Sequence, residues 1–322
     1  MHFVKSFGIL RHSVAVLTLA TAASAGLASL AGATTNVYEQ PLVSGIADHI
    51  FVAHVTKGGM PTGTFDMIVE QLDPWTSTGN LVPTSWNAGS QTGFFPTSPS
   101  TAQMGYRNKA GTSTAQMEGG VVGAYLNSRD LPTTKSNRLF MITPQYRYIP
   151  GTEPVPFGSS TSVLNGEMDL QVPVAVGKDT YVTADFLFLD ANGTRISFGF
   201  KAFQNGVAGT TVFGSLYDVP EAVFILNSPI APGQKFVSIA AGSAVAGGDT
   251  WSGWRHFQWS INRAQFAAAL KYLVAKYPGK ITSTDPAAYV FSQVHLNAEF
   301  MYSPAPAELG WSMKNMNVWI TG

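Results

Sequence analysis

WRHFQWSINRAQFAAALKYLVAKYPGKITSTDPAAYVFSQVHLNAEFMY, residues 254–302, is the stretch that decides the fold. Its first eight residues are aromatic and alternate with polar ones, which is typical of a strand. Residues 262–277 carry apolar side chains at helical spacing, and residues 287–302 return to a strand pattern. A closing strand is expected at residues 310–320. One helix set between strands predicts a β-rich domain on which that helix packs.

The helix carries its own start and stop signals. Asn262 can accept hydrogen bonds from the free backbone donors of the first turn, and Gln265 completes a capping box three residues later. Pro278 and Gly279 end the helix. Apolar residues at helical spacing form one stripe, which consists of Phe266, Leu270, Leu273, Val274 and Tyr277. One face of the helix is therefore expected to lie on a sheet.

Strand patterns separated by turns fill most of the remaining chain. Asn192 and Gly193, between two alternating apolar runs, are the strongest hairpin signal. Residues 73–114 are rich in Ser, Thr, Gly, Pro and Asn and are expected to form a long ordered loop. The expected strands are 46–55, 64–72, 119–126, 138–149, 166–176, 180–190, 194–203, 210–217, 221–227 and 234–241. This spacing predicts an all-β sandwich.

The first 33 residues have the pattern of a secretory signal peptide. Lys5 and Arg11 precede an uncharged apolar run, and small-residue cleavage sites follow at residues 23–25 and 31–33. The alternative is an uncleaved membrane anchor, since the run approaches the ~18 residues that span a bilayer. Residues 1–33 are therefore expected to be removed, and residues 34–322 to be a single domain secreted to the periplasm or the cell exterior.

Composition limits the partners of this chain. Charged residues make up 12% of the 322 residues, and Lys plus Arg equals Asp plus Glu at 19 each. Without a basic field there is no reason to expect nucleic acid, or a membrane once the signal peptide is cleaved. An uncharged surface rich in hydroxyl and aromatic groups suits a neutral polysaccharide or oligosaccharide. That is the expected partner.

Several kinds of chemistry are set aside by the absence of their motifs. The chain has no cysteine, which excludes thiol nucleophiles and thiolate metal sites. It has no Gly-rich phosphate loop, zinc-binding His-Glu-x-x-His or Gly-x-Ser-x-Gly elbow, and its six histidines lack ligand spacing. No cofactor or metal is expected. Carboxylates on strands remain, and a pair of them can hydrolyse a glycosidic bond.

Four segments near the C-terminus resemble the end of the jelly-roll cellulase and xylanase families. They are HFQWSI (256–261), FAAALKYLV (266–274), YVFSQVHLNAEF (289–300) and WSMKNMNVWI (311–320). In those families one helix packs under a bent sandwich, an acid/base glutamate lies in a late strand, and the nucleophile lies on a neighbouring strand. The resemblance implies a jelly-roll (concanavalin-like) β-sandwich with one packed C-terminal α-helix.

Three glutamates are the candidate catalytic residues. By the resemblance, Glu299 would be the acid/base, and Glu221, which opens an apolar strand, would be the nucleophile. Glu167 is the rival partner, because strict alternation places it with Asp169 on one polar face of a strand. The resemblance thus implies a glycoside hydrolase, with the partner of Glu299 left open.

Aromatic side chains are the candidate sugar-binding residues. Trp251, Trp254 and Trp259 belong to the closing segment, and Trp75 and Trp86 to the expected loop. An aromatic ring can stack on a sugar, although it more often packs into the core. Two further hypotheses stay open: a non-catalytic, lectin-like glycan-binding module, and an extracellular structural protein without a small ligand.

Overall fold

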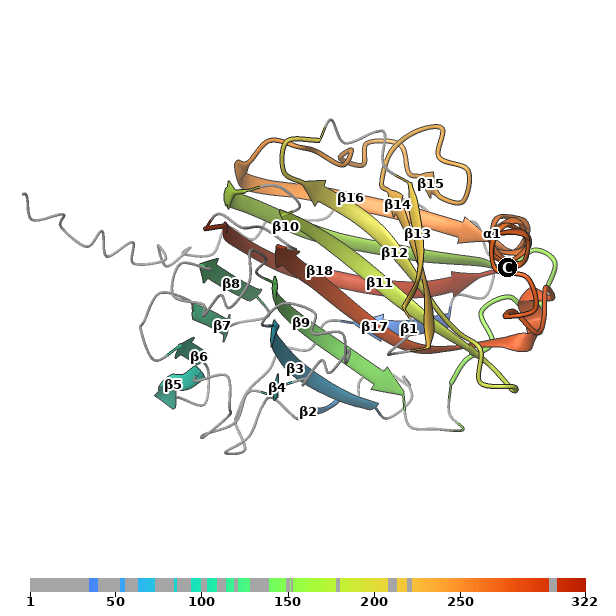
Figure 1. The fold of residues 1–322 in the computed structure, drawn as a ribbon, viewed down its shortest axis with the longest axis horizontal. Coiled ribbons are helices and arrows are strands. Elements are labelled where there is room, and N and C mark those ends of the chain that lie inside the picture. Colours follow the sequence, from blue (N-terminus) through green and yellow to red (C-terminus); the bar gives the residue numbers. More distant parts are fainter. Residues whose placement is uncertain are drawn as a thin grey trace, which may run out of the picture. The chain divides into compact units, whose positions relative to one another are not determined.

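Two β-sheets and one α-helix make up the described part of the chain (Figure 1). The computed structural model describes residues 151–322 apart from residues 152, 178–179, 208–212, 219–221 and 301–305, together with the strands that precede residue 151. All these elements belong to one compact unit, which begins at Ala33. The signal peptide expected at residues 1–33 lies outside the described residues and stays a prediction.

Sheet A contains nine of the described strands, and the long strands β10, β16 and β18 lie next to one another in it. Its strands, in order across the sheet, are β15 (Ser238–Ile239), β16 (Trp251–Asn262), β10 (Val163–Val176), β18 (Glu308–Thr321), β8 (Val121–Asn127), β7 (Thr114–Glu118), β6 (Gln103–Asn108) and β5 (Phe94–Pro99), with β1 (Thr35–Glu39) also paired to β18. These pairings are antiparallel.

Sheet B contains the other nine described strands. Its strands, in order, are β13 (Gly214–Asp218), β14 (Val223–Pro229), β12 (Arg195–Gln204), β11 (Thr180–Asp190), β17 (Tyr289–Phe300), β9 (Leu139–Tyr148), β3 (Gly63–Leu72) and β2 (Ala53–Val55), with β4 (Thr84–Ser85) also paired to β3. Only β12 and β14 run parallel among these described strands.

The chain crosses repeatedly between the two sheets. It passes from β10 in sheet A through β11, β12, β13 and β14 in sheet B, returns to sheet A with β15 and β16, and ends with β17 in sheet B and β18 in sheet A. Apolar side chains from both sheets fill the space between them; the rings of Phe186 and Trp259, for example, lie 6.0 Å apart. The fold is the expected all-β, jelly-roll sandwich with one helix.

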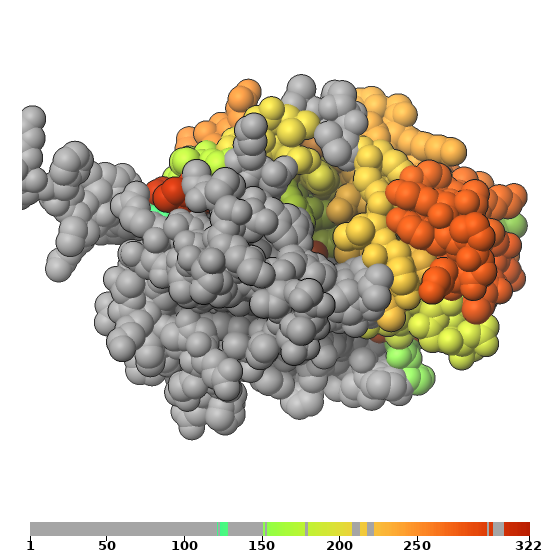
Figure 2. Space-filling view, viewed as in Figure 1, coloured from blue at the N-terminus to red at the C-terminus, as the bar shows by residue number. Residues whose placement is uncertain are grey.

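Helix α1 (Arg263–Lys276) follows β16 directly, and its predicted capping box is present. Asn262 Oδ1 accepts from the backbone of Gln265 at 2.8 Å, and Gln265 Oε1 accepts from the backbone of Asn262 at 2.9 Å. The buried side is anchored by Phe266, whose ring stacks 4.6 Å from that of Phe157. The exposed side contributes to the molecular surface, where α1 appears in orange (Figure 2). A single-turn 3-10 helix, η1 (Pro286–Ala288), leads into β17.

Two expectations about local structure need correction. The stretch 73–114, expected to be one loop, contains the short strands β4, β5 and β6, while its remaining residues before Thr114 lie outside those described. Of the strand expected at residues 234–241, only β15 forms, since its partner β16 pairs at just Ser238 and Ile239. The hairpin at Asn192 and Gly193 is confirmed: β11 and β12 are antiparallel, and Gly193 adopts φ +82°.

Candidate functional site

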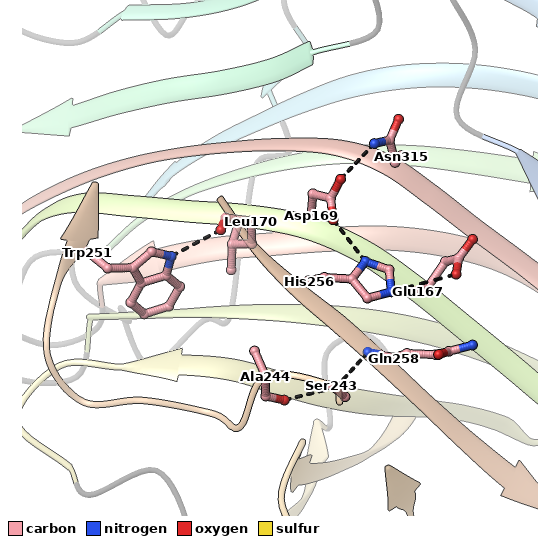
Figure 3. A network of polar contacts seen from close by, with 9 residues as sticks. All are labelled: Glu167, Asp169, Leu170, Ser243, Ala244, Trp251, His256, Gln258 and Asn315. Carbon is pink, nitrogen blue, oxygen red and sulfur yellow. Dashed lines mark hydrogen bonds and ion pairs between the residues drawn. The ribbon is translucent and has the colours of Figure 1, made fainter. Parts of the chain in front are cut away.

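A polar network lies on the outer face of sheet A, the side of β10, β16 and β18 that points away from the core (Figure 3). Asp169 of β10 is at its centre. Its Oδ1 lies 2.9 Å from Nδ1 of His256 on β16, and its Oδ2 accepts from Nδ2 of Asn315 on β18 at 2.6 Å. The other ring nitrogen of His256 lies 3.9 Å from Oε2 of Glu167. One imidazole therefore lies between two carboxylates on a partly exposed surface.

Strand alternation creates this face. Glu167 and Asp169 alternate along β10 with Met168 and Leu170, which are fully buried in the core. Cross-strand register then places Asp169 opposite His256. The side chains of Glu167, Asp169 and His256 remain 29%, 18% and 49% exposed. They are held in place by their neighbours and can still reach a ligand.

An irregularity in β18 adds Asn315 to the network. The register between β10 and β18 shifts between Glu167 and Asp169, and Asn315 adopts φ +53°, which side chains other than glycine rarely do. Its hydrogen bond to Asp169 favours this conformation. Bulges of this kind are frequent beside functional sites, where they redirect a side chain.

Trp254 extends the same face along β16. It is half buried, and the ammonium of Lys314 on β18 lies 4.4 Å from its ring centroid. Two residues beyond His256 in the other direction, the backbone N–H of Gln258 donates to Oγ of Ser243 at 2.8 Å. The outer face of sheet A thus combines an aromatic ring with fixed donors and acceptors.

Of the five candidate tryptophans, Trp254 is the one that the described structure places on a partly exposed face. Trp251 and Trp259 are 8% and 1% exposed and pack in the core, so their expected role as sugar platforms is wrong. The Nε1 of Trp251 donates to the backbone of Leu170 at 3.0 Å, which ties β16 to β10. Trp75 and Trp86 lie outside the described residues.

The candidate glutamates do not gather at one place. Glu299 belongs to β17 in sheet B, while Glu167 lies on the outer face of sheet A, so the packed core separates them. Since packed sheets are about 10 Å apart, Glu167 cannot be the partner of Glu299. Glu221 lies outside the described residues, and the strand that follows it, β14, is separated from β17 by β12 and β11.

The backbone register shows which positions flank Glu299 instead. Position 299 pairs with Tyr181 of β11 on one side and with Met141 of β9 on the other. Met141 pairs in turn with Glu70 of β3. Glu70 therefore occupies the same cross-strand row as Glu299, two strands away, a residue that sequence reasoning missed because strand order is not written in the sequence.

A second polar cluster lies on sheet B around Asp185 of β11. The alternation along β11 sends Ala184 and Phe186 into the core and Asp185 to the opposite side, yet Asp185 is only 1% exposed. Its Oδ2 accepts from Nδ2 of Asn297 on β17 at 2.6 Å, and its Oδ1 from Oγ of Ser197 on β12 at 3.4 Å. This carboxyl group connects the three central strands of sheet B.

Burial raises the pKa of Asp185 to about 7; the hydrogen bonds from Ser197 and Asn297 and the charge of Lys201 act in the opposite direction. A carboxyl group with such a pKa in a strand is a candidate functional residue. Sequence reasoning missed it, although a signal was there: Asp185 is an acid within the apolar run TADFLFLD.

The described residues contain neither a metal-binding cluster nor a membrane-spanning helix. No group of three or more His, Cys, Asp or Glu side chains in this part of the chain could hold a metal ion, the network around His256 included. Within the same residues, no helix is long and apolar enough to cross a membrane.

Comparisons with known proteins give distant likenesses of architecture. No family model and no curated protein sequence matches the chain. Among solved structures, the xyloglucanase domain of NopAA, a type three effector from Sinorhizobium fredii in complex with cellobiose, covers 84% of this chain and 96% of its own at 11% identity and a TM-score of 0.33. The family 11 xylanase from Neocallimastix patriciarum covers 68% and 91% at 11% identity and a TM-score of 0.32. Endoglucanase 3 from Trichoderma harzianum covers 70% and 93% at 9% identity and a TM-score of 0.27.

Proposed function

We propose that this protein binds a neutral polysaccharide on the outer face of sheet A, around Trp254, His256 and Glu167. The observation that carries the proposal is the position of Trp254 on β16, the strand of His256 and Gln258, where its half-buried ring has its centroid 4.4 Å from the ammonium of Lys314. A sugar ring offers an apolar C–H face and a rim of hydroxyl groups, which suit an aromatic ring and fixed polar groups respectively. The low charge of the chain agrees with a neutral ligand.

Rigidity of the polar groups supports binding. The imidazole of His256 and the amide of Asn315 are both fixed by the carboxylate of Asp169. Side chains that are already ordered lose little conformational entropy when a ligand arrives, and each ordering event avoided saves about 0.5–1.5 kcal/mol. Glu167 and Asp169 do not present an open catalytic pair, because His256 occupies the space between them.

Substitution of Trp254 tests the site. The wild type and Trp254→Ala are titrated with soluble β-glucan, xylan and xyloglucan in a calorimeter, and we expect Trp254→Ala to weaken binding about tenfold, ~1.4 kcal/mol. Tyr217→Ala is the matched control, since Tyr217 is a half-buried aromatic residue on β13 of the other sheet. Equal losses in both variants, or no binding of any glycan by the wild type, would contradict the proposal. The latter result would favour a structural role outside the cell.

Hydrolysis is the second candidate function, and the row of Glu299, Met141 and Glu70 on sheet B favours it. Two strand spacings separate the Cα atoms of these glutamates by about 10 Å. Glutamates at that separation can bring their carboxyl groups within the 6.5–9.5 Å that an inverting glycosidase needs for its water. In this mechanism Glu299 protonates the leaving oxygen and Glu70 activates the water.

Release of reducing sugar tests hydrolysis separately from binding. The same glycans are incubated with the wild type, Glu299→Gln and Glu70→Gln, and each substitution should reduce the rate at least a hundredfold. Glu153→Gln, before β10 and outside both proposed sites, is the control and should leave the rate unchanged. Binding without release of sugar would leave the lectin-like function and exclude hydrolysis.

A further inference from the structure

Asp185 connects three strands on the side of sheet B that faces away from the core. Its two carboxyl oxygens accept from Asn297 of β17 at 2.6 Å and from Ser197 of β12 at 3.4 Å. Asn297 is two residues from Glu299 on the same strand, so it lies on the same face of β17 as position 299. The protonation state of Asp185 can therefore affect β17, the strand that carries Glu299.

The surroundings of Asp185 favour a proton on its carboxyl group. A Cβ atom on Gly199, directly opposite on β12, would lie 2.5 Å from Oδ1 of Asp185 and closer still to Oδ1 of Asn227 on β14. The two oxygens thus face each other across the glycine. Two acceptors in this arrangement repel each other, whereas a protonated carboxyl group can donate toward the amide oxygen.

Thr183 lies in the same polar layer, the buried polar side chains around Asp185 on the outer face of sheet B. It gives an independent indication that this layer is short of hydrogen-bond partners among the described residues. It lies two residues before Asp185 on the same face of β11 and is 1% exposed. Its Oγ1 has no hydrogen-bond partner among the described residues. Leaving a buried polar group unpaired costs about 1–3 kcal/mol, and both Thr183 and Asp185 are 1% exposed. An ionised carboxylate in the same layer is correspondingly costly.

Groups on the described neighbouring strands offset part of that cost. On β12 the buried Lys201 attracts the ionised form, and on β17 the register position opposite Asp185 is His295. On the far side of β12, β14 contributes the neutral Asn227 at this level. Burial outweighs these influences and raises the pKa of Asp185 to about 7.

We propose that Asp185 takes up a proton when sheet B folds, and that the packing of β12, β11 and β17 therefore loosens as pH rises through the neutral range. Between pH 3.8, the ordinary pKa of an aspartate, and about pH 7, its pKa in the folded protein, the folded state carries this proton and the unfolded chain does not. Stability from this proton is fully present below pH 3.8 and is lost as pH rises toward about 7. The expected effect of this proton on Glu299 rests on the proposed hydrolytic function. The uptake of the proton by Asp185 does not rest on it.

Thermal and denaturant unfolding between pH 4 and pH 9 test the proposal. In the wild type the equilibrium constant for unfolding should increase up to about tenfold for each pH unit between pH 4 and pH 7. Asp185→Asn keeps the shape and removes the titration, so this contribution should disappear. Asp169→Asn, at a similar position on β10 of sheet A, leaves Asp185 in place and should keep it.

Two outcomes would overturn the proposal. The first is that the wild type and Asp185→Asn have the same pH dependence. The second is that the Asp185 carboxyl group titrates near pH 4 in a 13C NMR titration of the folded wild type. This measurement can be made even if Asp185→Asn does not fold. If the protein hydrolyses glycans, the alkaline limb of its rate profile should move in Asp185→Asn. If no hydrolysis is detected, the hydrolytic function is excluded. The unfolding data alone then test the uptake of the proton by Asp185.

Discussion

Asp169 and Asp185 are the same residue type in the middle of long antiparallel strands, and both alternate out of the same core, yet their surroundings differ completely. The side chain of Asp169 on sheet A is 18% exposed and contacts His256 and Asn315. Asp185 on sheet B is 1% exposed and accepts hydrogen bonds from Asn297 and Ser197 of the neighbouring strands. The alternation of a strand therefore determines which side of the sheet a residue occupies, and not whether that side meets water.

This difference separates the chemistry of the two faces. On sheet A, the carboxylates of Glu167 and Asp169 share one histidine and remain within reach of solvent, which suits recognition of an uncharged ligand. On sheet B, a carboxyl group removed from water favours its protonated form. Paired substitutions, one on each sheet, show whether the contrast is real.

The largest contrast is expected between two glycines. A methyl group on Gly199 of β12 would collide with oxygen atoms of Asp185 and Asn227, whereas a methyl group on Gly253 of β16 would meet no atom within 4 Å. We expect Gly199→Ala to reduce the free energy of unfolding by about 3 kcal/mol, since overpacking typically costs 1–3. Gly253→Ala should change it by less than ~1 kcal/mol, as urea titrations can measure. Equal effects would contradict a tightly filled layer on sheet B.

A smaller contrast is expected between the partners of the two aspartates. Asn297→Ala removes a hydrogen bond from the buried Asp185 and should cost about 2 kcal/mol, because a buried acceptor then loses a donor. His256→Ala removes an exposed contact to Asp169 and should cost less than ~1 kcal/mol. Raising the salt concentration should diminish the second effect and leave the first. If His256→Ala proves the more costly change, the assignment of buried and exposed faces is reversed.

The smallest effect, with the opposite sign, is expected for Thr183. The Oγ1 of Thr183 has no hydrogen-bond partner in the described part of the chain, so replacing it with a methyl group in Thr183→Val should stabilise the fold by about 1 kcal/mol. Thr194 is the control, because it is also buried but its Oγ1 lies 2.9 Å from Oγ1 of Thr282. Thr194→Val should therefore destabilise the protein. Differential scanning calorimetry of both variants gives the two signs, and destabilisation by Thr183→Val would show that its hydroxyl group has a partner.

Local features were predictable from the sequence. The capping box of Asn262 and Gln265, the hairpin at Gly193 and the alternation of β10 all depend on residues a few positions apart. Each expresses a rule of backbone geometry that holds wherever the segment lies. The all-β sandwich with one helix followed from these features together.

Non-local features were not predictable in the same way. Trp251 and Trp254 are three residues apart on β16 in similar sequence contexts. Trp251 is nevertheless buried in the core, whereas Trp254 is only half buried. The row that joins Glu70 to Glu299 depends on the order β3, β9, β17, which brings together residues more than 200 positions apart. The apolar run around Asp185 can be read from the sequence, but the burial of its carboxyl group depends on how the neighbouring strands pack.

We propose that the glycan is recognised on the outer face of sheet A. A residue-resolved NMR titration of the wild type with soluble xyloglucan or β-glucan tests it most directly. We predict that the indole N–H of Trp254 and the imidazole of His256 shift progressively as glycan is added, while the backbone amides of Thr183 and Asp185 change little. Shifts confined to sheet B, or none at any glycan concentration, would contradict the claim.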